Sequence, residues 1–410
     1  MKAEKNQIQV SRKGASRIHS GHLWIFRSDI AGEINAEGGA IVTVLDERRK
    51  FLGKAFYSDS SEIALRFITT QDVKIDKEFW RARILDAQMR RGRNTARLEP
   101  TAAAGGLRLE NHRPETVTAN RLVFSEGDLI SSLIVDVYDD VFVIQTLSQG
   151  TEKIKQIFVE ILLEEFAPRA IVERNDVKVR EKENLPLQNG LLFGTCPDEI
   201  IIEQDGIKFA VAPLGGQKTG AFLDQRENRF ALRKYARGRA LDCFTFNGGF
   251  ALNLALTCDN VRAIDISSDA IKLAARNAEL NQISNVNFET ANVFDFLKDA
   301  ETAGERFDTI VLDPPAFAKN RGSVQNAVRG YKEINLRALK MLNKNGILAT
   351  CTCSHHVTEE LFLQTVLEAA NDAGKSVQLI EKRAQSSDHP ILLGVPETYY
   401  LKCLILRVLN

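Results

Sequence analysis

The sequence carries no net charge, because its 410 residues contain 54 Lys and Arg against 54 Asp and Glu. Nucleic-acid-binding proteins commonly have a basic excess, so this total argues against that class. The charges are unevenly distributed, however. Residues 1–100 contain 19 basic and 13 acidic side chains, a net of +6, which leaves the other 310 residues near −6. A basic N-terminal part therefore remains compatible with binding to nucleic acid.

Clustered cysteines and long apolar runs are also absent. Of the six cysteines only Cys351 and Cys353 lie close together, which gives neither a disulfide framework nor a zinc-binding pattern. No window approaches 18 apolar residues, and the first ten residues lack the apolar segment of a signal peptide. We therefore expect a soluble protein of the reducing cytoplasm with no membrane association.

At about 100–200 residues per domain, the length predicts two to four domains. Residues 1–75 contain short strand-like runs, such as 41–45 and 63–68, with glycines between them and no long helical pattern, which predicts a small β-barrel. Residues 76–115 form an arginine-rich helix and a linker. Residues 116–212 read as a small α/β domain, with a hairpin over 133–145, a helix over 152–165 and a strand over 170–173.

The helix expected over residues 77–97 has an apolar face and an arginine face. Trp80, Ile84 and Met89 recur at helical spacing, whereas the other face carries Arg81, Arg83, Arg90, Arg91 and Arg93. Two interpretations stay open at this point: a solvated helix face, or a surface that contacts the phosphates of a nucleic acid.

From residue 238 onward strands and helices alternate with short connections, which predicts an α/β domain with a parallel sheet covered on both faces. Such a fold places its binding site beyond the carboxyl ends of the strands. The expected strands are 240–242, 261–265, 286–289, 309–312 and 347–350, and the expected helices are 250–256, 269–280, a short one through 297, 324–342 and 359–373.

The first two of these strand ends predict a nucleoside cofactor. Gly248 and Gly249 follow the first strand and allow a ligand to approach the backbone closely. Asp265 ends the second strand, where an acidic side chain accepts hydrogen bonds from ribose hydroxyls. The phosphate-binding motifs G-x-G-x-x-G and G-x-x-x-x-G-K-[ST] are absent, so S-adenosylmethionine fits better than a dinucleotide. The alternative is that the 265–267 segment merely caps the following helix.

Chemistry is expected at two further strand ends. Asp313-Pro-Pro follows the fourth strand and is typical of methyltransferases that act on nitrogenous bases, although it could also be a rigid turn. The fifth strand runs into Thr350-Cys-Thr-Cys353. By alternation Cys351 should be a buried strand residue and Cys353 should lie in the loop beyond the strand, where a thiol can act as a nucleophile. The segment 215–229 is expected to form a lid over the cofactor, with a flexible linker as the alternative.

Over essentially its whole length the chain resembles the bacterial large-subunit (23S) rRNA cytosine-C5 methyltransferases, which join an N-terminal PUA domain to a class I S-adenosylmethionine domain. The resemblance lies in the segments 21–26, 124–128, 133–138, 216–226, 313–315, 330–335 and 386–390. It implies a PUA-like barrel over 1–75, a central α/β domain over 116–212 and a Rossmann-like, mostly parallel seven-stranded methyltransferase domain over 213–410. The chain departs from the family pattern at Ser131-Ser132, where Pro-Gly is usual, and at Asn292, where Asp is usual.

The resemblance also implies roles for individual residues. Cys353 matches the nucleophile and Asp313 the residue that orients the target base. Cys353 would add to cytosine C6 so that C5 can accept a methyl group, on a base flipped out of its stack. No metal is implied; the partners implied are large-subunit rRNA before assembly is complete and a second copy of the chain. The implied cofactor site consists of Gln217, Lys218, Thr219, Asp242, Phe244, Asn247, Gly248, Gly249, Asp265, Ile266, Asn292, Val293, Asp313 and Pro314.

Three other functions are weighed against this one. A methyltransferase acting on an exocyclic amine would also use Asp-Pro-Pro, usually followed directly by an aromatic residue, but Ala316 intervenes before Phe317. A non-catalytic RNA-binding assembly factor could retain the fold. A metal-dependent hydrolase is disfavoured because the sequence has no ligand cluster.

Overall fold

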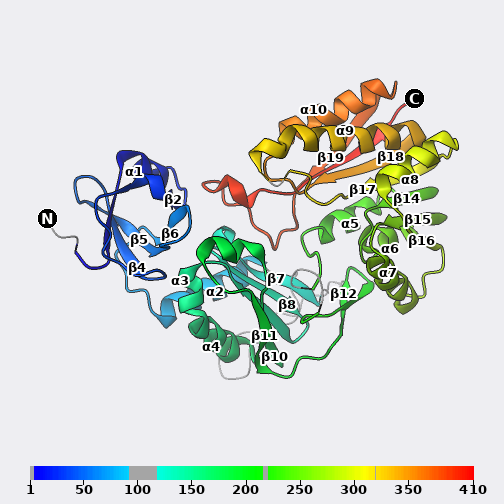
Figure 1. Ribbon diagram of the computed structural model, residues 1–410. Coiled ribbons are helices and arrows are strands. Elements are labelled where there is room, and N and C mark those ends of the chain that lie inside the picture. Colours follow the sequence, from blue (N-terminus) through cyan, green and yellow to red (C-terminus); the bar gives the residue numbers. More distant parts are fainter. Residues whose placement is uncertain (1–3, 92–117, 216–219, 319) are drawn as a thin grey trace. The chain divides into compact units, whose positions relative to one another are not determined.

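The computed structural model describes residues 4–91, 118–215, 220–318 and 320–410 (Figure 1). The chain forms two compact units. The first unit contains residues 1–202, 211–223 and 387–398, and the second contains residues 203–210, 224–386 and 399–410. Within the described residues no helix is long and apolar enough to cross a membrane.

The N-terminal part of the first unit is a six-stranded sheet in the order β2-β6-β5-β4-β1-β3. It also contains a helix that the sequence did not predict, α1 (Arg12–His19), which begins where Ser11 accepts a hydrogen bond from the Gly14 backbone. This helix escaped notice because only Ala15 and Ile18 give it an apolar face. The strands are β1 (Gln7–Val10), β2 (Trp24–Phe26), β3 (Ile30–Ala31), β4 (Ile41–Leu45), β5 (Phe51–Tyr57) and β6 (Ile63–Thr69).

The central part of the first unit is a five-stranded sheet in the order β11-β10-β9-β8-β7. The predicted hairpin is confirmed, since β8 and β9 pair antiparallel across Asp139 and Asp140. The region predicted as one helix over residues 152–165 instead forms parts of two helices, α3 and α4, which are separated at Ile154. The elements are α2 (Lys77–Arg91), β7 (Ala119–Phe124), β8 (Leu133–Tyr138), β9 (Val141–Thr146), α3 (Gln149–Lys153), α4 (Lys155–Phe166), β10 (Ala170–Asn175) and β11 (Gln188–Gly194).

One departure from the family pattern has a backbone consequence. Ser132 has a φ of 68°, in the left-handed region that glycine adopts most easily. The family's usual glycine therefore stands where the backbone favours it, and serine is accommodated there with some strain.

The arginines of α2 make contacts inside the first unit that neither interpretation of this face included. Arg91 is buried and forms an ion pair with Asp128, which Arg90 approaches at 3.3 Å. Arg83 donates hydrogen bonds to two backbone carbonyls, and its burial lowers its pKa. Arg81 pairs with three glutamates, Glu78, Glu164 and Glu165. These four arginines therefore connect α2 to other elements of the first unit, including α4 and β6; Arg93 lies outside the described residues.

The second unit is a seven-stranded sheet in the order β16-β15-β14-β17-β18-β20-β19, as predicted for a class I methyltransferase. All neighbouring strands are parallel except that β20 runs antiparallel to both β18 and β19. The strands are β14 (Arg239–Cys243), β15 (Asn260–Asp265), β16 (Val286–Thr290), β17 (Phe307–Leu312), β18 (Leu342–Thr352), β19 (Val377–Arg383) and β20 (Lys402–Val408). A separate pair, β12 (Ile200–Gln204) and β13 (Ile207–Val211), links the units.

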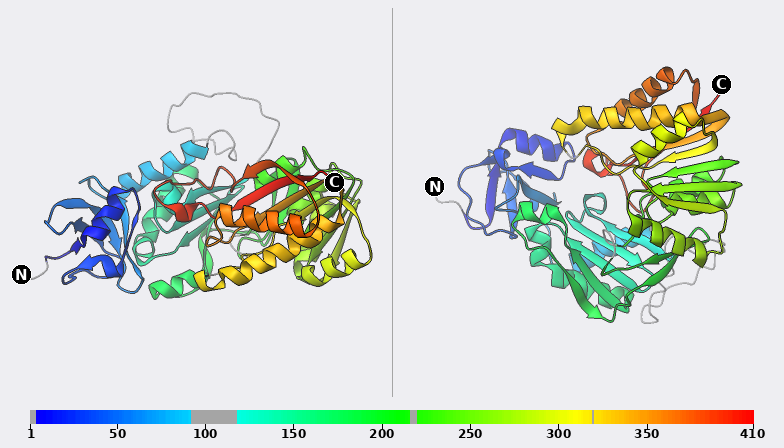
Figure 2. Two further views of the ribbon diagram at one scale, coloured as in Figure 1. Left: turned by 90° about the horizontal axis from the view of Figure 1, so that it is seen from above. Right: turned by 45° about the vertical axis from the view of Figure 1, so that its right-hand side comes forward.

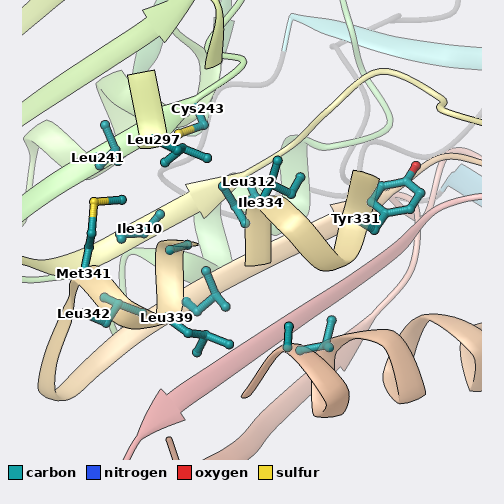
Figure 3. Close-up of a cluster of buried hydrophobic side chains, with 14 of the residues drawn as sticks. Leu241, Cys243, Leu297, Ile310, Leu312, Tyr331, Ile334, Leu339, Met341 and Leu342 are labelled. Atoms are coloured by element: carbon teal, nitrogen blue, oxygen red, sulfur yellow. The ribbon is translucent and has the colours of Figure 1, made fainter. Parts of the chain in front are cut away.

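Helices cover both faces of this sheet (Figures 1 and 2). Residues of α8, α9 and α10 pack on one face, where Leu241, Ile310, Leu312 and Ile334 meet in the largest buried cluster (Figure 3). Residues of α5 and α6 pack on the other face. The helices are α5 (Arg226–Leu232), α6 (Gly249–Ala255), α7 (Ser268–Leu280), α8 (Val293–Thr302), α9 (Val324–Met341) and α10 (Glu359–Asp372).

Residues 387–398 lie near the C-terminus but belong to the first unit. The Asp388 carboxylate accepts a hydrogen bond from the Arg121 backbone at 2.9 Å, and its carbonyl accepts one from Arg91 at 3.0 Å. Farther along, Glu397 contacts His22 at 3.2 Å. The first compact unit therefore includes this late segment together with residues 1–202 and 211–223, and the domain boundaries predicted at 75, 115 and 212 remain a prediction.

Candidate active site

Four predicted functional residues come together at one edge of the second unit's sheet. Asp242 is the second-last residue of β14 and Asp265 is the last residue of β15. Asp313 follows β17 and Cys353 follows β18. These four strands are parallel and adjacent, so their carboxyl ends meet. The expected difference between the two cysteines is also confirmed: β18 ends at Thr352, Cys351 is fully buried, and Cys353 lies just beyond the strand and is partly exposed.

Asp242 is a buried carboxylate with one oxygen still available. Its Oδ2 accepts hydrogen bonds from the Thr245 hydroxyl at 2.6 Å and from the Ala251 backbone at 2.9 Å. Its Oδ1 has no hydrogen-bond partner among the described residues. Burial, with a further contribution from the charge of Asp313, raises the pKa of Asp242 to about 7. The side chain can therefore accept a cationic hydrogen-bond donor.

Arg229 on α5 is the matching cation at this edge. A Cβ added to Gly249 would lie 2.6 Å from the Arg229 Cζ, so the guanidinium group rests directly against the glycine backbone. The side chain is buried, and its Nε has no hydrogen-bond partner within the described structure. Burial lowers the pKa of Arg229, opposed by the charges of Asp313, Asp224 and Asp242. The residue thus offers an unsatisfied hydrogen-bond donor beside the glycine pair.

The loop between β14 and α6 has an uncommon backbone. Phe244 and Phe246 have φ values of 65° and 48°, which are rare for aromatic residues and cost energy. Asp265 stabilises this loop, since its Oδ2 accepts a hydrogen bond from the Phe246 backbone at 2.9 Å. The nitrogen of Asn277 donates to the Asn247 carbonyl at 2.9 Å from the other side. Strained residues of this kind concentrate at binding sites.

The alternative, that the segment 265–267 caps the following helix, holds for Ser267 but not for Asp265. Ser267 caps α7 by accepting a hydrogen bond from the Ala270 backbone, whereas Asp265 bonds to the Ser267 and Phe246 backbones. The neighbouring Ile266 side chain is 69% exposed at this edge, an uncommon state for isoleucine. An acidic residue followed by an exposed apolar side chain suits a ribose and a purine ring.

Asn292 and Val293 lie where β16 leads into α8. The Asn292 Oδ1 accepts a hydrogen bond from the Phe294 backbone at 2.9 Å and so caps α8. Val293 is buried. The same oxygen accepts a second, longer hydrogen bond from the Asp295 backbone at 3.4 Å, and the predicted contact of Asn292 with adenine remains a prediction.

Hydrogen bonds tie the Asp313-Pro-Pro segment to the cysteine loop. The Cys353 Sγ lies 3.9 Å from the Pro314 carbonyl oxygen as a weak donor. The next residue, Ser354, accepts a hydrogen bond from the Ala318 backbone at 3.1 Å. On the other side Asp313 accepts a hydrogen bond from the Gln225 amide at 2.8 Å. Cys353 and Asp313 are therefore held together on two short loops.

Buried Tyr331 on α9 supports the cysteine loop from below. Its hydroxyl accepts a hydrogen bond from Thr352 at 2.8 Å and bonds to Ser354 at 2.9 Å, on either side of Cys353.

Tyr331→Phe should lower the free energy of unfolding by about 1–2 kcal/mol, because two buried hydroxyls lose a partner. We expect turnover to fall about fivefold with little change in cofactor affinity. Denaturant unfolding and kinetic assays of this variant, of Ser354→Ala and of the double variant would measure the coupling; additive effects would contradict it.

Several residues at this edge were not predicted as site residues. They are Gln225, Arg229, Tyr331 and Lys402. The first two belong to the segment 215–229, whose polar density was the only signal. The predicted residues Gln217, Lys218 and Thr219 lie outside the described residues. The rings of His355 and His356 lie 5.3 Å apart, and within the described ranges no group of three or more His, Cys, Asp or Glu could hold a metal ion.

Comparisons with known proteins match both halves of this architecture. Residues 8–70 match a PUA-like domain and residues 236–391 a methyltransferase domain. Proteins named ribosomal RNA large subunit methyltransferase I are 41% identical in Tolumonas auensis, over 95% of this chain and 96% of that protein, and 38% identical in Pseudoalteromonas atlantica, over 95% of each. The chain belongs to the ribosomal RNA large subunit methyltransferase I family. This membership confirms the predicted S-adenosylmethionine-dependent methyltransferase with an N-terminal PUA-like domain.

A solved structure supports the fold of this family member independently. A SAM-dependent methyltransferase from Streptococcus mutans superimposes with a TM-score of 0.80 at 19% identity, over 98% of this chain and 100% of that one. At that identity the likeness concerns the fold alone.

Proposed function

We propose that this chain methylates C5 of a cytosine in large-subunit ribosomal RNA through a covalent adduct with Cys353. The names of the relatives support the RNA substrate. The observation that carries the chemistry is the position of Cys353 beyond β18, 3.9 Å from the Pro314 carbonyl and on the loop adjoining Asp313. A thiol at that place has no structural role comparable to that of buried Cys351.

The residues at the sheet edge fit S-adenosylmethionine. Arg229 and Asp242 offer an unsatisfied donor and an unsatisfied acceptor on either side of the glycine pair, which suits the carboxylate and ammonium of an amino acid. Asp265 suits the ribose hydroxyls and exposed Ile266 the adenine ring. The cofactor supplies an electrophilic methyl group when it is bound.

The protein's own groups would prepare the cytosine. The Cys353 thiolate adds to C6, which forms the S–C6 bond and turns C5 into a nucleophile. Asp313, fixed by Gln225, holds the N3/N4 edge of the base by accepting a hydrogen bond from the N4 amino group. After methyl transfer a base removes the C5 proton, and the S–C6 bond breaks to release Cys353. The target nucleotide must be unpaired or flipped, at a cost of a few kcal/mol.

One observation weighs against methylation of an exocyclic amine. In that chemistry an aromatic residue directly after Asp-Pro-Pro faces the target base, whereas here Ala316 intervenes. Phe317 instead packs among aromatic residues, 4.7 Å from Tyr331 and 5.9 Å from Phe294 between ring centroids. Cytosine C5 is therefore the better-supported target.

The remaining predictions about partners belong to this proposal. The PUA-like domain would contact RNA phosphates, so binding should weaken as salt rises. We further propose that the protein acts in the cytoplasm on rRNA before subunit assembly is complete, and that it forms a homodimer.

Mapping 5-methylcytosine in rRNA by mass spectrometry tests the proposed function. Cells that lack this protein should lose one 5-methylcytosine in large-subunit rRNA, and expression of the intact chain should restore it. An unchanged rRNA pattern would exclude the substrate. Loss of a methylated amine in place of 5-methylcytosine would favour the alternative chemistry.

Cofactor affinity should depend on the protonation of Asp242. Its pKa is about 7 without ligand, and an ammonium group beside it would favour the ionised form and lower that pKa. Binding should therefore release a proton below pH 7, and the affinity for S-adenosylhomocysteine should fall about fivefold between pH 7 and pH 6. Titration calorimetry at both pH values would measure this. An Asp242→Asn variant serves as the control and should bind more weakly with no such dependence.

A further inference from the structure

Lys402 is a buried lysine at the catalytic edge of the sheet. It begins β20, which runs antiparallel to β18, so its position coincides with the carboxyl end of β18. In the register of these strands Lys402 stands opposite Thr352, the residue immediately before Cys353. Only 3% of Lys402 is exposed. Burying an ammonium group costs several kcal/mol unless nearby charges or hydrogen bonds compensate for it.

The compensation that the described structure offers is small. The Lys402 Nζ donates one hydrogen bond, to the Tyr400 carbonyl at 3.3 Å, and lies 5.2 Å from the centroid of the Tyr399 ring. An ammonium group has three donors. Burial lowers the pKa of Lys402, and the two charges that oppose this shift are those of Cys353 and Glu359.

Glu359 is already occupied by other partners. Its Oε1 accepts a hydrogen bond from Lys382 at 2.6 Å, and its Oε2 accepts one from the Tyr399 hydroxyl at 2.7 Å. Lys382 and Lys402 are thus two cations around one carboxylate. A neutral Cys353 thiol leaves this group with one excess positive charge, whereas a Cys353 thiolate neutralises it.

The other ionisable groups near Cys353 do not supply that charge. Tyr331 faces it from α9, and burial raises the pKa of Tyr331, so its hydroxyl is neutral at neutral pH. Asp313 on the adjoining loop is an acid and opposes a thiolate. His355 and His356 follow in the cysteine's own loop, one largely exposed and one half-buried.

We propose that the ammonium group of Lys402 holds Cys353 in its thiolate form, which makes Lys402 a positioning residue for the nucleophile. The importance of this for methylation rests on the proposed function, but the thiolate itself is measurable without any methyl transfer. Thiolates near a lysine are more abundant at neutral pH and react faster with alkylating agents.

The test is the rate at which iodoacetamide alkylates Cys353 in the full-length protein between pH 6 and pH 10, followed on the Cys353 peptide by mass spectrometry. Lys402→Met keeps the side-chain length and removes the charge, so it should slow alkylation about tenfold at pH 7. The difference should vanish near pH 10, where the thiol is ionised in both proteins. Lys402→Arg should keep most of the wild-type rate.

Two further variants separate this role from a structural one. Lys272→Met removes an exposed lysine of the same unit and should leave the profile unchanged. Glu359→Gln removes the competing carboxylate and should speed alkylation at pH 7 about threefold, which provides a test even if Lys402→Met does not fold. An unchanged profile in Lys402→Met, or equal slowing at every pH, would overturn the proposal. Methylation that persists without Cys353 would contradict the proposed function, but it would not affect the measured dependence of Cys353 alkylation on Lys402.

Discussion

Replacing Cys353 with alanine is expected to abolish methylation of cytosine while cofactor binding changes less than twofold. The thiolate is the only group of the described site that can add to C6, and without that adduct C5 is too weak a nucleophile. The residues proposed to bind the cofactor lie elsewhere, Arg229 on α5 and Asp242 and Asp265 at the ends of β14 and β15, so their contacts should persist. Incorporation of labelled methyl groups into rRNA and calorimetric titration with S-adenosylhomocysteine would measure the two effects.

Cys351→Ala is the matched control, because it removes a thiol two residues earlier from the core. This substitution should lower the free energy of unfolding slightly, because a small buried side chain is lost. Turnover should stay within about threefold of the wild-type value. A Cys353→Ala variant that still methylates RNA would exclude the adduct and favour an exocyclic amine as the acceptor. Serine is a poor choice at this position, since its hydroxyl keeps some hydrogen bonding.

Arg229→Gln should weaken binding of S-adenosylhomocysteine about 30- to 100-fold, because a buried charge-assisted hydrogen bond to the ligand's carboxylate is lost. The discriminating ligand is 5′-methylthioadenosine, which has the same nucleoside but no amino acid group. Its affinity should change less than threefold. The wild-type protein should strongly prefer S-adenosylhomocysteine, and the variant should lose most of that preference.

Arg233→Gln provides the control for this experiment. Arg233 follows α5 and donates hydrogen bonds to Asn253 at 2.7 Å and to the Asp205 carbonyl at 2.9 Å. Its substitution therefore removes the same charge as Arg229→Gln but takes no hydrogen-bond donor from the proposed cofactor site. Both affinities should stay near their wild-type values. If Arg229→Gln weakened the two ligands equally, Arg229 would act on the shape of the site and not on the carboxylate.

Features that depend on local periodicity could be predicted from the sequence. The strand–helix alternation after residue 238 gave the parallel sheet, and alternation within β18 placed Cys351 inside and Cys353 beyond the strand. The hairpin around Asp139 and Asp140 followed from two apolar runs and a turn. Helix α1 was missed because its short apolar face resembles a loop.

Features that depend on partners distant in the sequence could not be predicted. The arginine face of α2 suggested either a solvated face or a surface for RNA, but its partners Asp128 and Glu164 are 37 and 83 residues away from the arginines that they bind. Lys402 stands at the start of an apolar run, and only the antiparallel pairing of β20 with β18 brings it to the nucleophile. Periodicity contains no information on such pairings.

The segment 387–398 has a consequence for how this protein is made. Buried Arg91 and the backbone of Arg121 bond to Asp388, so the first unit includes a residue that follows most of the second unit in the sequence. The N-terminal two hundred residues leave the ribosome long before Asp388 does, and domains that fold during synthesis normally do so once their own residues have emerged. Here Arg91 already has Asp128 as its ion-pair partner, but the first unit gains its contacts with Asp388 only after residues 224–386 of the second unit have been made. In this member of the ribosomal RNA large subunit methyltransferase I family, the unit that is started first is therefore completed only after most of the second unit has been synthesised.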